Sequence, residues 1–364
     1  MTDLTVAFIG LGLIGGSIAK GLKRGAPDTK IMAYMRTRSK LEQAKADGIV
    51  DVILDGVDEQ LQECDIIFLC TPVEYNADYL KKIRPYLKKG AVVTDVGSTK
   101  TNIHETVIEL GMESCFVGGH PMAGSEKTGY ESATDHLLEN AYYIITPTAQ
   151  SRDSDIALLT DVADTIGAMP LVLDYKKHDF IVAAISHLPH LIASSLVNLV
   201  HDCDSEDQMM KRLAAGGFKD ITRIASSSPI MWEQICMTNE DNISVVLEKY
   251  IASLNTLLVQ LKQQENSAIY RLFESSRDYR SSFAETAKGP LAPEYSFSVD
   301  IVDEPGAISI ISSILAGKGI SIKNIGINHN REHGEGALRI SFYDEASMKE
   351  AEERLHKFNY TLFA

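Results

Sequence analysis

The feature that most constrains the fold is a glycine-rich turn set between a strand and a helix. Residues 4–9 are mostly apolar and predict a strand that is buried on both faces. Residues 10–15 read G-L-G-L-I-G, and a helical pattern follows them. A second strand is expected at residues 31–35, at the distance that a βαβ unit needs. This context turns a short glycine motif into a prediction of a Rossmann-type domain that binds a dinucleotide.

Each glycine of the turn has its own expected task. Gly10 permits the tight turn, Gly12 lets a pyrophosphate approach the backbone, and Gly15 lets the helix pack closely on the strand. The N–H groups at the start of the helix, around Leu13 and Ile14, are expected to hold the phosphates.

The end of the second predicted strand bears on the choice of cofactor. An acidic residue there accepts hydrogen bonds from the ribose 2′-hydroxyl of NAD. This chain has Met35, Arg36 and Arg38 instead. Arginine suits a 2′-phosphate, so these residues favour NADP or tolerance of both cofactors. The alternative is that both arginines are solvated loop residues.

The strand–helix alternation continues beyond the first unit. Strands are predicted at residues 65–70 and 91–95. Ligands of open α/β sheets bind at the carboxyl ends of the strands. Thr71, Pro72 and Ser98 follow these strands and are therefore expected to line the nicotinamide half of the cofactor site.

Composition restricts the partners of the chain. The formal net charge is −15, which argues against nucleic acid, so an anionic ligand would need locally placed positive charge. No apolar run of the sequence approaches the ~18 residues of a membrane span, and the N-terminus is better explained as a buried strand than as a signal peptide. The five cysteines form no Cys-x-x-Cys pair and are interpreted as buried apolar residues. A cytoplasmic protein without a membrane partner is expected.

Three further segments carry a family resemblance. Residues 115–119 predict a strand that leads into residues 119–126, which read G-H-P-M-A-G-S-E. Residues 186–190 read S-H-L-P-H, and residues 216–225 read G-G-F-K-D-I-T-R-I-A. Together with the glycine turn and the D-V-G-S-T-K segment at 95–100, they occur in the order typical of one family. The chain resembles the prephenate and arogenate dehydrogenases over roughly residues 4–285.

The resemblance implies oxidative decarboxylation of prephenate to 4-hydroxyphenylpyruvate with NAD(P)⁺. The chemistry needs a base at the C4 hydroxyl, and a neutral imidazole suits that task near pH 7. We assign it to His120; Ser98 by resemblance bonds the same hydroxyl. Arg223 is expected to bind the ring carboxylate as a fixed cationic fork, and His190 to contact the pyruvyl side chain.

Other residues of these motifs are assigned more loosely. Ser125 and Glu126 are expected to flank the substrate, and Lys219 either pairs with Asp220 or faces the entrance. Arg223 could instead form a structural ion pair with Asp220. A metal site is not expected, because His187 and His190 have no third ligand at a suitable spacing. The family's usual cofactor is NAD, which stands against the local preference for NADP.

The chain is divided by its patterns into an α/β Rossmann-type N-terminal domain at 1–173, an all-α domain at 174–287, a linker at 288–294 and a last domain at 295–364. Apolar residues recur at helical spacing through the all-α domain, most clearly at 243–261. By resemblance, this domain binds substrate and forms an interlocked homodimer.

The last domain shows the β-α-β-β-α-β order of a ferredoxin-like fold. With D-E-P-G-A at 303–307 and Asn324-Ile325, it resembles the ACT regulatory domain. Feedback inhibition by L-tyrosine is the natural hypothesis, with Pro305, Gly306 and Asn324 near the effector. The alternative is a domain that only stabilises the dimer.

Two other functions remain open. Arogenate dehydrogenase would use the same catalytic core on the amino analogue of prephenate. A non-catalytic sensor that binds NAD(P) would not need a base aimed at a hydroxyl, so His120, Ser98 and Arg223 argue against it.

Overall fold

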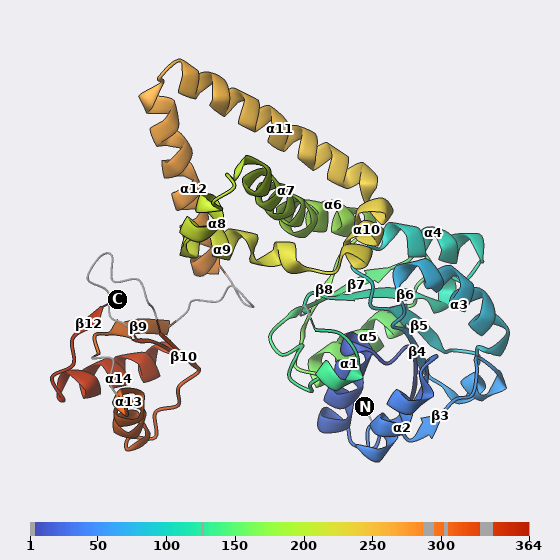
Figure 1. Ribbon diagram of the computed structural model, residues 1–364. Helices are drawn as coiled ribbons and strands as arrows, with labels where there is room; N and C mark the ends of the chain where they lie inside the picture. The colour runs from blue at the N-terminus through green and yellow to red at the C-terminus, as the bar shows by residue number, and fades with distance from the viewer. Residues whose placement is uncertain (1–3, 125–126, 287–294, 302–304, 328–337, 364) are drawn as a thin grey trace. The chain divides into compact units, whose positions relative to one another are not determined.

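The computed structural model describes residues 4–124, 127–286, 295–301, 305–327 and 338–363. The chain folds into two compact units, Met1–Ile269 and Tyr270–Ala364. Figure 1 shows the sheets and helices of each unit with the labels used below. The linker expected at 288–294, together with Ser125, Glu126 and the Asp303–Glu304 turn, lies outside the described residues.

The N-terminal part of the first unit is a parallel sheet flanked by helices. Its strand order is β3-β2-β1-β4-β5, with bounds β1 Thr5–Ile9, β2 Lys30–Tyr34, β3 Val52–Ile53, β4 Ile66–Leu69 and β5 Val92–Asp95. The helices are α1 Leu13–Gly25, α2 Arg38–Ala46, α3 Asn76–Ile83 and α4 Thr101–Glu109. Ile9 of β1 lies in register with Tyr34 of β2 and Leu69 of β4, so the three strands end at one edge. This is the predicted Rossmann-type arrangement.

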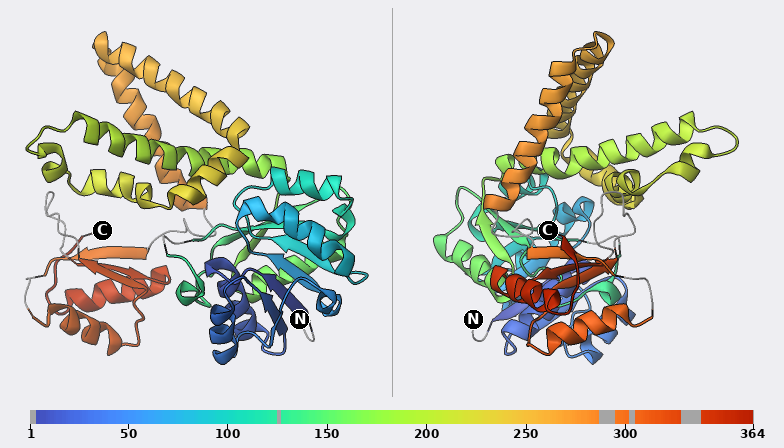
Figure 2. Two further views of the ribbon diagram at one scale, coloured as in Figure 1. Left: turned by 45° about the vertical axis from the view of Figure 1, so that its right-hand side comes forward. Right: turned by 90° about the vertical axis from the view of Figure 1, so that its left-hand side faces the viewer.

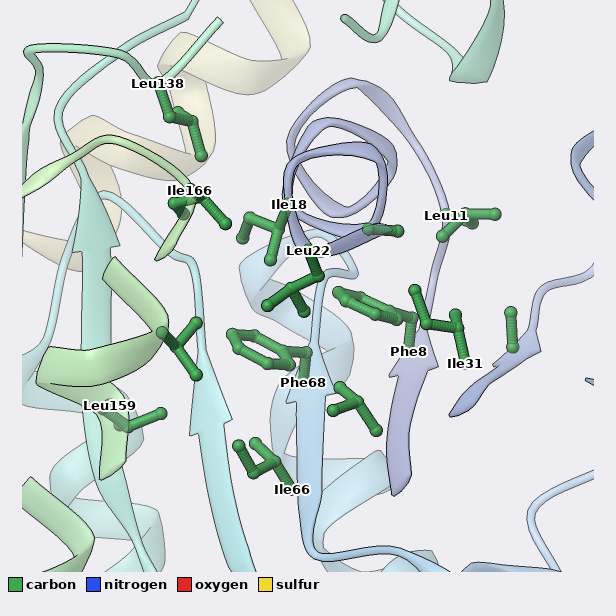
Figure 3. Packing of buried hydrophobic residues seen from close by; sticks show 14 of the residues in the cluster. Phe8, Leu11, Ile18, Leu22, Ile31, Ile66, Phe68, Leu138, Leu159 and Ile166 are labelled. Carbon is green, nitrogen blue, oxygen red and sulfur yellow. The ribbon is translucent and has the colours of Figure 1, made fainter. Parts of the chain in front are cut away.

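Aromatic and aliphatic side chains from neighbouring strands hold this sheet to α1. The rings of Phe8 and Phe68 stack with centroids 5.0 Å apart, and Figure 3 shows them next to Ile18 and Leu22 of α1. All four side chains are fully buried. Each such side chain stabilises the fold by about 1.5–3 kcal/mol through removal of apolar surface from water. The packing fixes the glycine turn, because that turn joins β1 directly to α1.

A second, three-stranded sheet continues the first unit. It consists of β6 Val117–Pro121, β7 Tyr142–Pro147 and β8 Met169–Val172, with α5 Asp153–Thr165 between β7 and β8. A parallel bridge between Val93 and Phe116 brings β6 next to β5. A strand was expected from Cys115 onward, but Glu113–Cys115 forms a 3-10 turn and the strand begins at Val117. Ordinary end effects explain a difference of this size.

The rest of the first unit is helical. The elements are α6 Tyr175–Val182, a π-helical turn Ala183–His187, α7 Leu188–Cys203, α8 Met209–Leu213, α9 Gly216–Thr222, a 3-10 turn Arg223–Ser226, α10 Pro229–Thr238 and α11 Glu240–Lys262. Figure 2 shows α7 and α11 as long rods that extend away from the sheets. The π-helical turn includes Ser186 and His187, the first two residues of the S-H-L-P-H segment, and such turns often accompany functional sites.

One helical stretch of the described residues, Tyr175–Cys203, is long and apolar enough to cross a membrane by length and composition. This differs from the expectation that no apolar run approaches the length of a span. Length and composition alone do not separate a span from a core or interface helix. Its first turns are tied to the sheet region, since the carboxylate of Asp179 accepts hydrogen bonds from the backbone N–H groups of Lys100 and Thr101. Asp179, His178 and His187 are also buried polar residues of this stretch.

The second unit contains a small antiparallel sheet with two helices. Its elements are β9 Tyr295–Val299, α13 Ala307–Ala316, β10 Asn324–Ile327, β11 Leu338–Phe342, α14 Glu345–His356 and β12 Leu362–Phe363, with strand order β10-β11-β9-β12. Phe297, Val299, Ile311, Ile340 and Leu355 form its core. The β-α-β-β-α-β order predicted from the sequence is therefore observed. Helix α12, Asn266–Thr286, contains the division between the two units.

Candidate active site

The glycine turn has the shape that a bound dinucleotide needs. Gly10 has a φ of +94°, and a Cβ there would meet the carbonyl oxygen of Cys70 at 2.7 Å. A Cβ on Gly15 would meet the carbonyl oxygen of Gly10 at 2.8 Å, whereas a Cβ on Gly12 would have nothing within 4 Å. Gly12 is also the N-cap of α1, and because it has no side chain it cannot cap the helix itself. The turn is thus tight against the protein and open at Gly12, which fits a pyrophosphate at the helix N-terminus.

Residues after β2 and β4 lie on either side of this turn. Thr71 and Pro72 follow β4, and the Thr71 hydroxyl donates a hydrogen bond to the side-chain oxygen of Asn76. Arg36 follows β2 and lies over the ring of Tyr75, with its guanidinium carbon 5.4 Å from the ring centroid. Arg38 begins α2 and forms ion pairs with Asp55 and Glu42. The two arginines therefore have different surroundings.

A buried ion pair connects the end of β5 to β6. Lys100 and Asp95 are fully buried and bonded to each other. Asp95 also accepts a hydrogen bond from the N–H of Gly119 at 3.2 Å, and Lys100 donates one to the carbonyl oxygen of Gly119 at 2.7 Å. Burial lowers the pKa of Lys100 although Asp95 opposes this effect. The pair fixes the backbone immediately before His120.

A chain of three side chains begins at His120. Its Nδ1 lies 2.8 Å from Nε2 of His178, and Nδ1 of His178 lies 2.8 Å from Oδ1 of Asp179. His120 belongs to β6 of the second sheet, whereas His178 and Asp179 belong to α6, so these hydrogen bonds join the two parts of the first unit. His178 and Asp179 are buried.

The direction of these hydrogen bonds follows from the carboxylate. An ionised Asp179 only accepts, so the Nδ1 of a neutral His178 carries the proton and its Nε2 is left as an acceptor. His120 must then donate through its Nδ1, which leaves the lone pair of Nε2 available. Burial opposes ionisation of Asp179, but hydrogen bonds from His178, Thr101 and Lys100 outweigh it and lower its pKa.

His120 is held as a neutral imidazole. Burial lowers its pKa well below the ordinary value of 6.5, and nearby His178, Lys100 and His187 add to this effect. His187 behaves in the same way: burial lowers its pKa to about 4. Asn239 donates hydrogen bonds to Nδ1 of His187 at 3.2 Å and to the carbonyl oxygen of Asp179 at 2.8 Å. A neutral imidazole near pH 7 can accept a proton from a bound hydroxyl.

The motifs at 186–190 and 216–225 meet at His190, where the backbone of Ile224 hydrogen-bonds its ring. His190 stacks on Trp232 with ring centroids 3.7 Å apart, and His187 lies edge-on to the same ring at 5.9 Å. Burial lowers the pKa of His190; a backbone hydrogen bond at Ile224 opposes this, and nearby Arg223 adds to it. Arg223 is exposed at the start of the 3-10 turn after α9. His190 and Arg223 are thus brought together.

The remaining expected residues are placed less tightly. Ser98 is half-buried three residues after Asp95, and Lys219 is exposed on α9. Pro305, Gly306 and Asn324 belong to the second unit, where Gly306 has a φ of +96° and is the N-cap of α13. Groups of three potential metal ligands do not occur within the described ranges.

Three residues of the site were missed by sequence reasoning. His178, Asp179 and Asn239 lie outside the quoted motifs, and His178 contacts His120 across 58 residues of sequence. A signal was present for two of them, because adjacent His and Asp residues lie within the helix that leads into S-H-L-P-H. Asn239 stands between two helices and carries no comparable signal.

The glycine turn on a parallel sheet and the neutral imidazole of His120 in β6 define an oxidoreductase of the Rossmann type. Two family models match the chain: the prephenate dehydrogenase nucleotide-binding domain over residues 18–172 and the prephenate dehydrogenase dimerization domain over residues 174–275. The chain belongs to the prephenate dehydrogenase family.

Individual relatives agree with this assignment. A prephenate dehydrogenase of Bacillus subtilis is 36% identical over 351 residues, which are 96% of this chain and 95% of that protein. The crystal structure of prephenate dehydrogenase from A. aeolicus with hydroxyphenyl propionate and NAD⁺ has a TM-score of 0.73 and 30% identity, covering 78% of this chain and 99% of that one. Synechocystis arogenate dehydrogenase has a TM-score of 0.70 and 31% identity, covering 77% and 100%.

Proposed function

We propose that this chain is a prephenate dehydrogenase of L-tyrosine biosynthesis, which converts prephenate to 4-hydroxyphenylpyruvate and CO₂. The single observation that carries the proposal is the neutral His120, oriented by His178 and Asp179. Its support among relatives is the match to prephenate dehydrogenase of Bacillus subtilis along nearly the whole chain. A cytoplasmic location accompanies this proposal, as for other enzymes of amino-acid biosynthesis.

The nucleotide-binding domain holds NAD(P)⁺, which when bound supplies the acceptor for the hydride that leaves C4 of the substrate. Gly10, Gly12 and Gly15 with the N–H groups of Leu13 and Ile14 would hold its pyrophosphate. Thr71, Pro72 and Ser98 would line its nicotinamide half, because they follow the ends of β4 and β5. Arg36 would lie on the adenosine side.

The protein residues then transfer one proton and bind two carboxylates. Nε2 of His120 takes the proton of the C4 hydroxyl as the C–H bond breaks, and Ser98 bonds the same oxygen. The electron pair of the bond to the ring carboxylate enters the ring as CO₂ leaves, so the ring becomes aromatic. His120 returns its proton to the phenol oxygen. Burial favours this base because an imidazole without charge is ready to accept.

Arg223 binds the ring carboxylate and His190 contacts the pyruvyl side chain in this proposal. Their proximity in the structure supports it, because the two groups of prephenate lie at one ring carbon. Lys219 is exposed on the same motif and would face the entrance. Ser125 and Glu126, outside the described residues, would flank the substrate.

The helical domain is proposed to form a homodimer. Ile251, Leu254 and Leu258 lie on one face of α11 at helical spacing and are 44–50% exposed in the single chain. Such a stripe on a long helix is typical of an interface. The matched dimerization domain supports the same conclusion.

We keep the functional domains at 1–173, 174–287 and 295–364 with a linker at 288–294. The two family matches, which meet between 172 and 174, support the first boundary. The last domain is proposed to be an ACT domain that binds L-tyrosine near Pro305, Gly306 and Asn324. The observed element order and the left-handed N-cap at Gly306 support this proposal.

Two alternatives are distinguished by what the protein turns over. Arogenate dehydrogenase is favoured by the similarity to the Synechocystis enzyme. A non-catalytic NAD(P)-bound sensor would retain cofactor binding without turnover. The His120→Ala variant tests the proposal: it should bind NAD(P)⁺ like the parent chain and lose turnover of prephenate by about 10²–10⁴-fold. Turnover at the parental rate would overturn the assignment of the base.

A further inference from the structure

The end of β2 lacks the group that normally selects NAD⁺. In Rossmann domains a carboxylate at this place accepts hydrogen bonds from the ribose 2′-hydroxyl. Strand β2 ends at Tyr34, and residues 35–41 read M-R-T-R-S-K-L. The segment therefore offers no carboxylate to that hydroxyl, but it contains several cationic and hydroxyl donors.

The two arginines of this segment differ in what already holds them. Arg38 is paired with Asp55 and with Glu42, the latter at 3.5 Å. Arg36 makes no ion pair with any described residue, and its guanidinium lies over the ring of Tyr75. Arg38 would have to give up a carboxylate to bind a phosphate, whereas Arg36 would not.

The topology places Arg36 on the adenosine side of the cofactor. Arg36 follows β2 and Tyr75 follows β4, and these strands lie on either side of β1 in the sheet. Because β1 leads into Gly10, the Arg36–Tyr75 pair spans the glycine turn. Both side chains are exposed, so they can contact an incoming nucleotide. A planar guanidinium can stack on a ring and still donate two parallel hydrogen bonds to a phosphate.

The start of α2 adds to the positive potential there. Thr37 is the N-cap of this nine-residue helix and makes no side-chain cap bond, and the first turn has no acidic residue. Lys40, in the same turn, is paired with Glu131. Free N–H groups at a helix start favour a phosphate when a cationic side chain is also available, and Arg36 supplies one.

We infer that Arg36 binds the 2′-phosphate of NADP⁺ and that the protein prefers NADP⁺ to NAD⁺ as its hydride acceptor. The inference rests on the proposed function for its kinetic form, but the recognition itself concerns only the nucleotide-binding domain. Loss of a charge-assisted contact to phosphate should cost on the order of tenfold to a hundredfold in affinity.

The binding test uses two adenosine fragments and needs no substrate. Adenosine 2′,5′-bisphosphate and adenosine 5′-monophosphate are titrated by calorimetry into the full-length parent chain and into Arg36→Gln and Arg38→Gln. The parent should bind the bisphosphate at least tenfold more tightly. Arg36→Gln should abolish most of that difference, and Arg38→Gln should reduce it much less. Equal affinity of the parent for both fragments, or an equal effect of the two substitutions, overturns the inference.

The kinetic test compares kcat/KM for NADP⁺ and NAD⁺ with prephenate. The ratio should favour NADP⁺ in the parent and fall by about tenfold to a hundredfold in Arg36→Gln. A parent ratio that favours NAD⁺ contradicts the inference. If the chain turns over neither cofactor but still binds the bisphosphate preferentially through Arg36, the proposed function fails and the inference stands.

Discussion

Nδ1 of His120 lies 2.8 Å from Nε2 of His178, whose own Nδ1 is bonded to Asp179. This series of hydrogen bonds leaves Nε2 of His120 as the proton acceptor. Replacing His178 with alanine should therefore lower kcat by about tenfold to a hundredfold, less than loss of the base itself. The KM for the cofactor should change little, because the glycine turn is untouched.

The matched variant is His178→Gln, whose amide oxygen can still accept the N–H of His120. It should recover part of the lost kcat in steady-state assays at pH 7. Equal kcat in the parent and in His178→Ala, with both proteins folded by circular dichroism, would show that His178 does not orient the base.

The pH dependence of turnover should reflect the low pKa of His120. Burial, together with His178, Lys100 and His187, keeps this imidazole neutral well below pH 6.5. The acidic limb of the kcat/KM profile should consequently have its midpoint below pH 6.5. A profile that loses half of its activity near pH 6.5 would mean that the base has an ordinary histidine pKa.

Three histidines should make the folded state sensitive to acid. Burial lowers the pKa of His104 and His187 to about 4, and that of His120 is lowered as well. Below pH 6.5 the unfolded chain binds these protons and the folded chain does not, so stability declines from pH 6.5 towards pH 4. Each of His104 and His187 should contribute a loss of about 3 kcal/mol over this range.

Urea unfolding at pH 7, 6 and 5 measures this decline. In the His104→Gln variant one titrating group is removed, and the slope of the unfolding free energy against pH should be shallower. The same free energy of unfolding at pH 7 and pH 5 would contradict the expectation.

Two glycines of the turn should separate stability from cofactor binding. A Cβ on Gly15 meets the Gly10 carbonyl oxygen at 2.8 Å and the Cys70 Cβ at 3.0 Å, so Gly15→Ala should destabilise the fold by about 1–3 kcal/mol. A Cβ on Gly12 meets nothing within 4 Å, so Gly12→Ala should melt near the parent temperature. It should nevertheless bind NAD(P)⁺ more weakly, because the pyrophosphate has to approach this backbone. Equal melting temperatures for both variants would contradict the packing role of Gly15. Full cofactor affinity in Gly12→Ala would contradict the binding role of Gly12.

The second unit should respond to L-tyrosine if it is an ACT domain. Tyrosine is expected to inhibit turnover and raise the melting temperature, and Asn324→Ala should weaken both responses. Differential scanning fluorimetry and initial rates over a tyrosine titration measure them. A titration that shifts neither quantity would leave this domain with a stabilising role only.

The sequence predicted those parts of the structure that depend on residues close together in the chain. The strand at 4–9, the glycine turn and the strand at 31–35 are observed within about one residue, because apolar runs and glycine conformation act over short distances. The βαββαβ order of the second unit was predicted for the same reason. The start of β6 was placed two residues too early, at Cys115.

The hydrogen-bonded chain at His120 could not be predicted in this way. It depends on α6 packing against the start of α4, where Asp179 accepts from the backbone of Lys100 and Thr101. No period or motif encodes a contact that arises only when two separate parts of the chain pack together. The roles of Lys100 and Asn239 are likewise visible only once their burial is known.

The most direct test of the central claim is an absorbance assay for the reduced nicotinamide. Purified chain is given prephenate or arogenate, each with NAD⁺ or NADP⁺. We expect fast turnover with prephenate, with 4-hydroxyphenylpyruvate as the product, and little with arogenate. Turnover of arogenate alone would reassign the substrate. No absorbance change in any of the four mixtures, with cofactor binding intact, would contradict the proposed dehydrogenase activity.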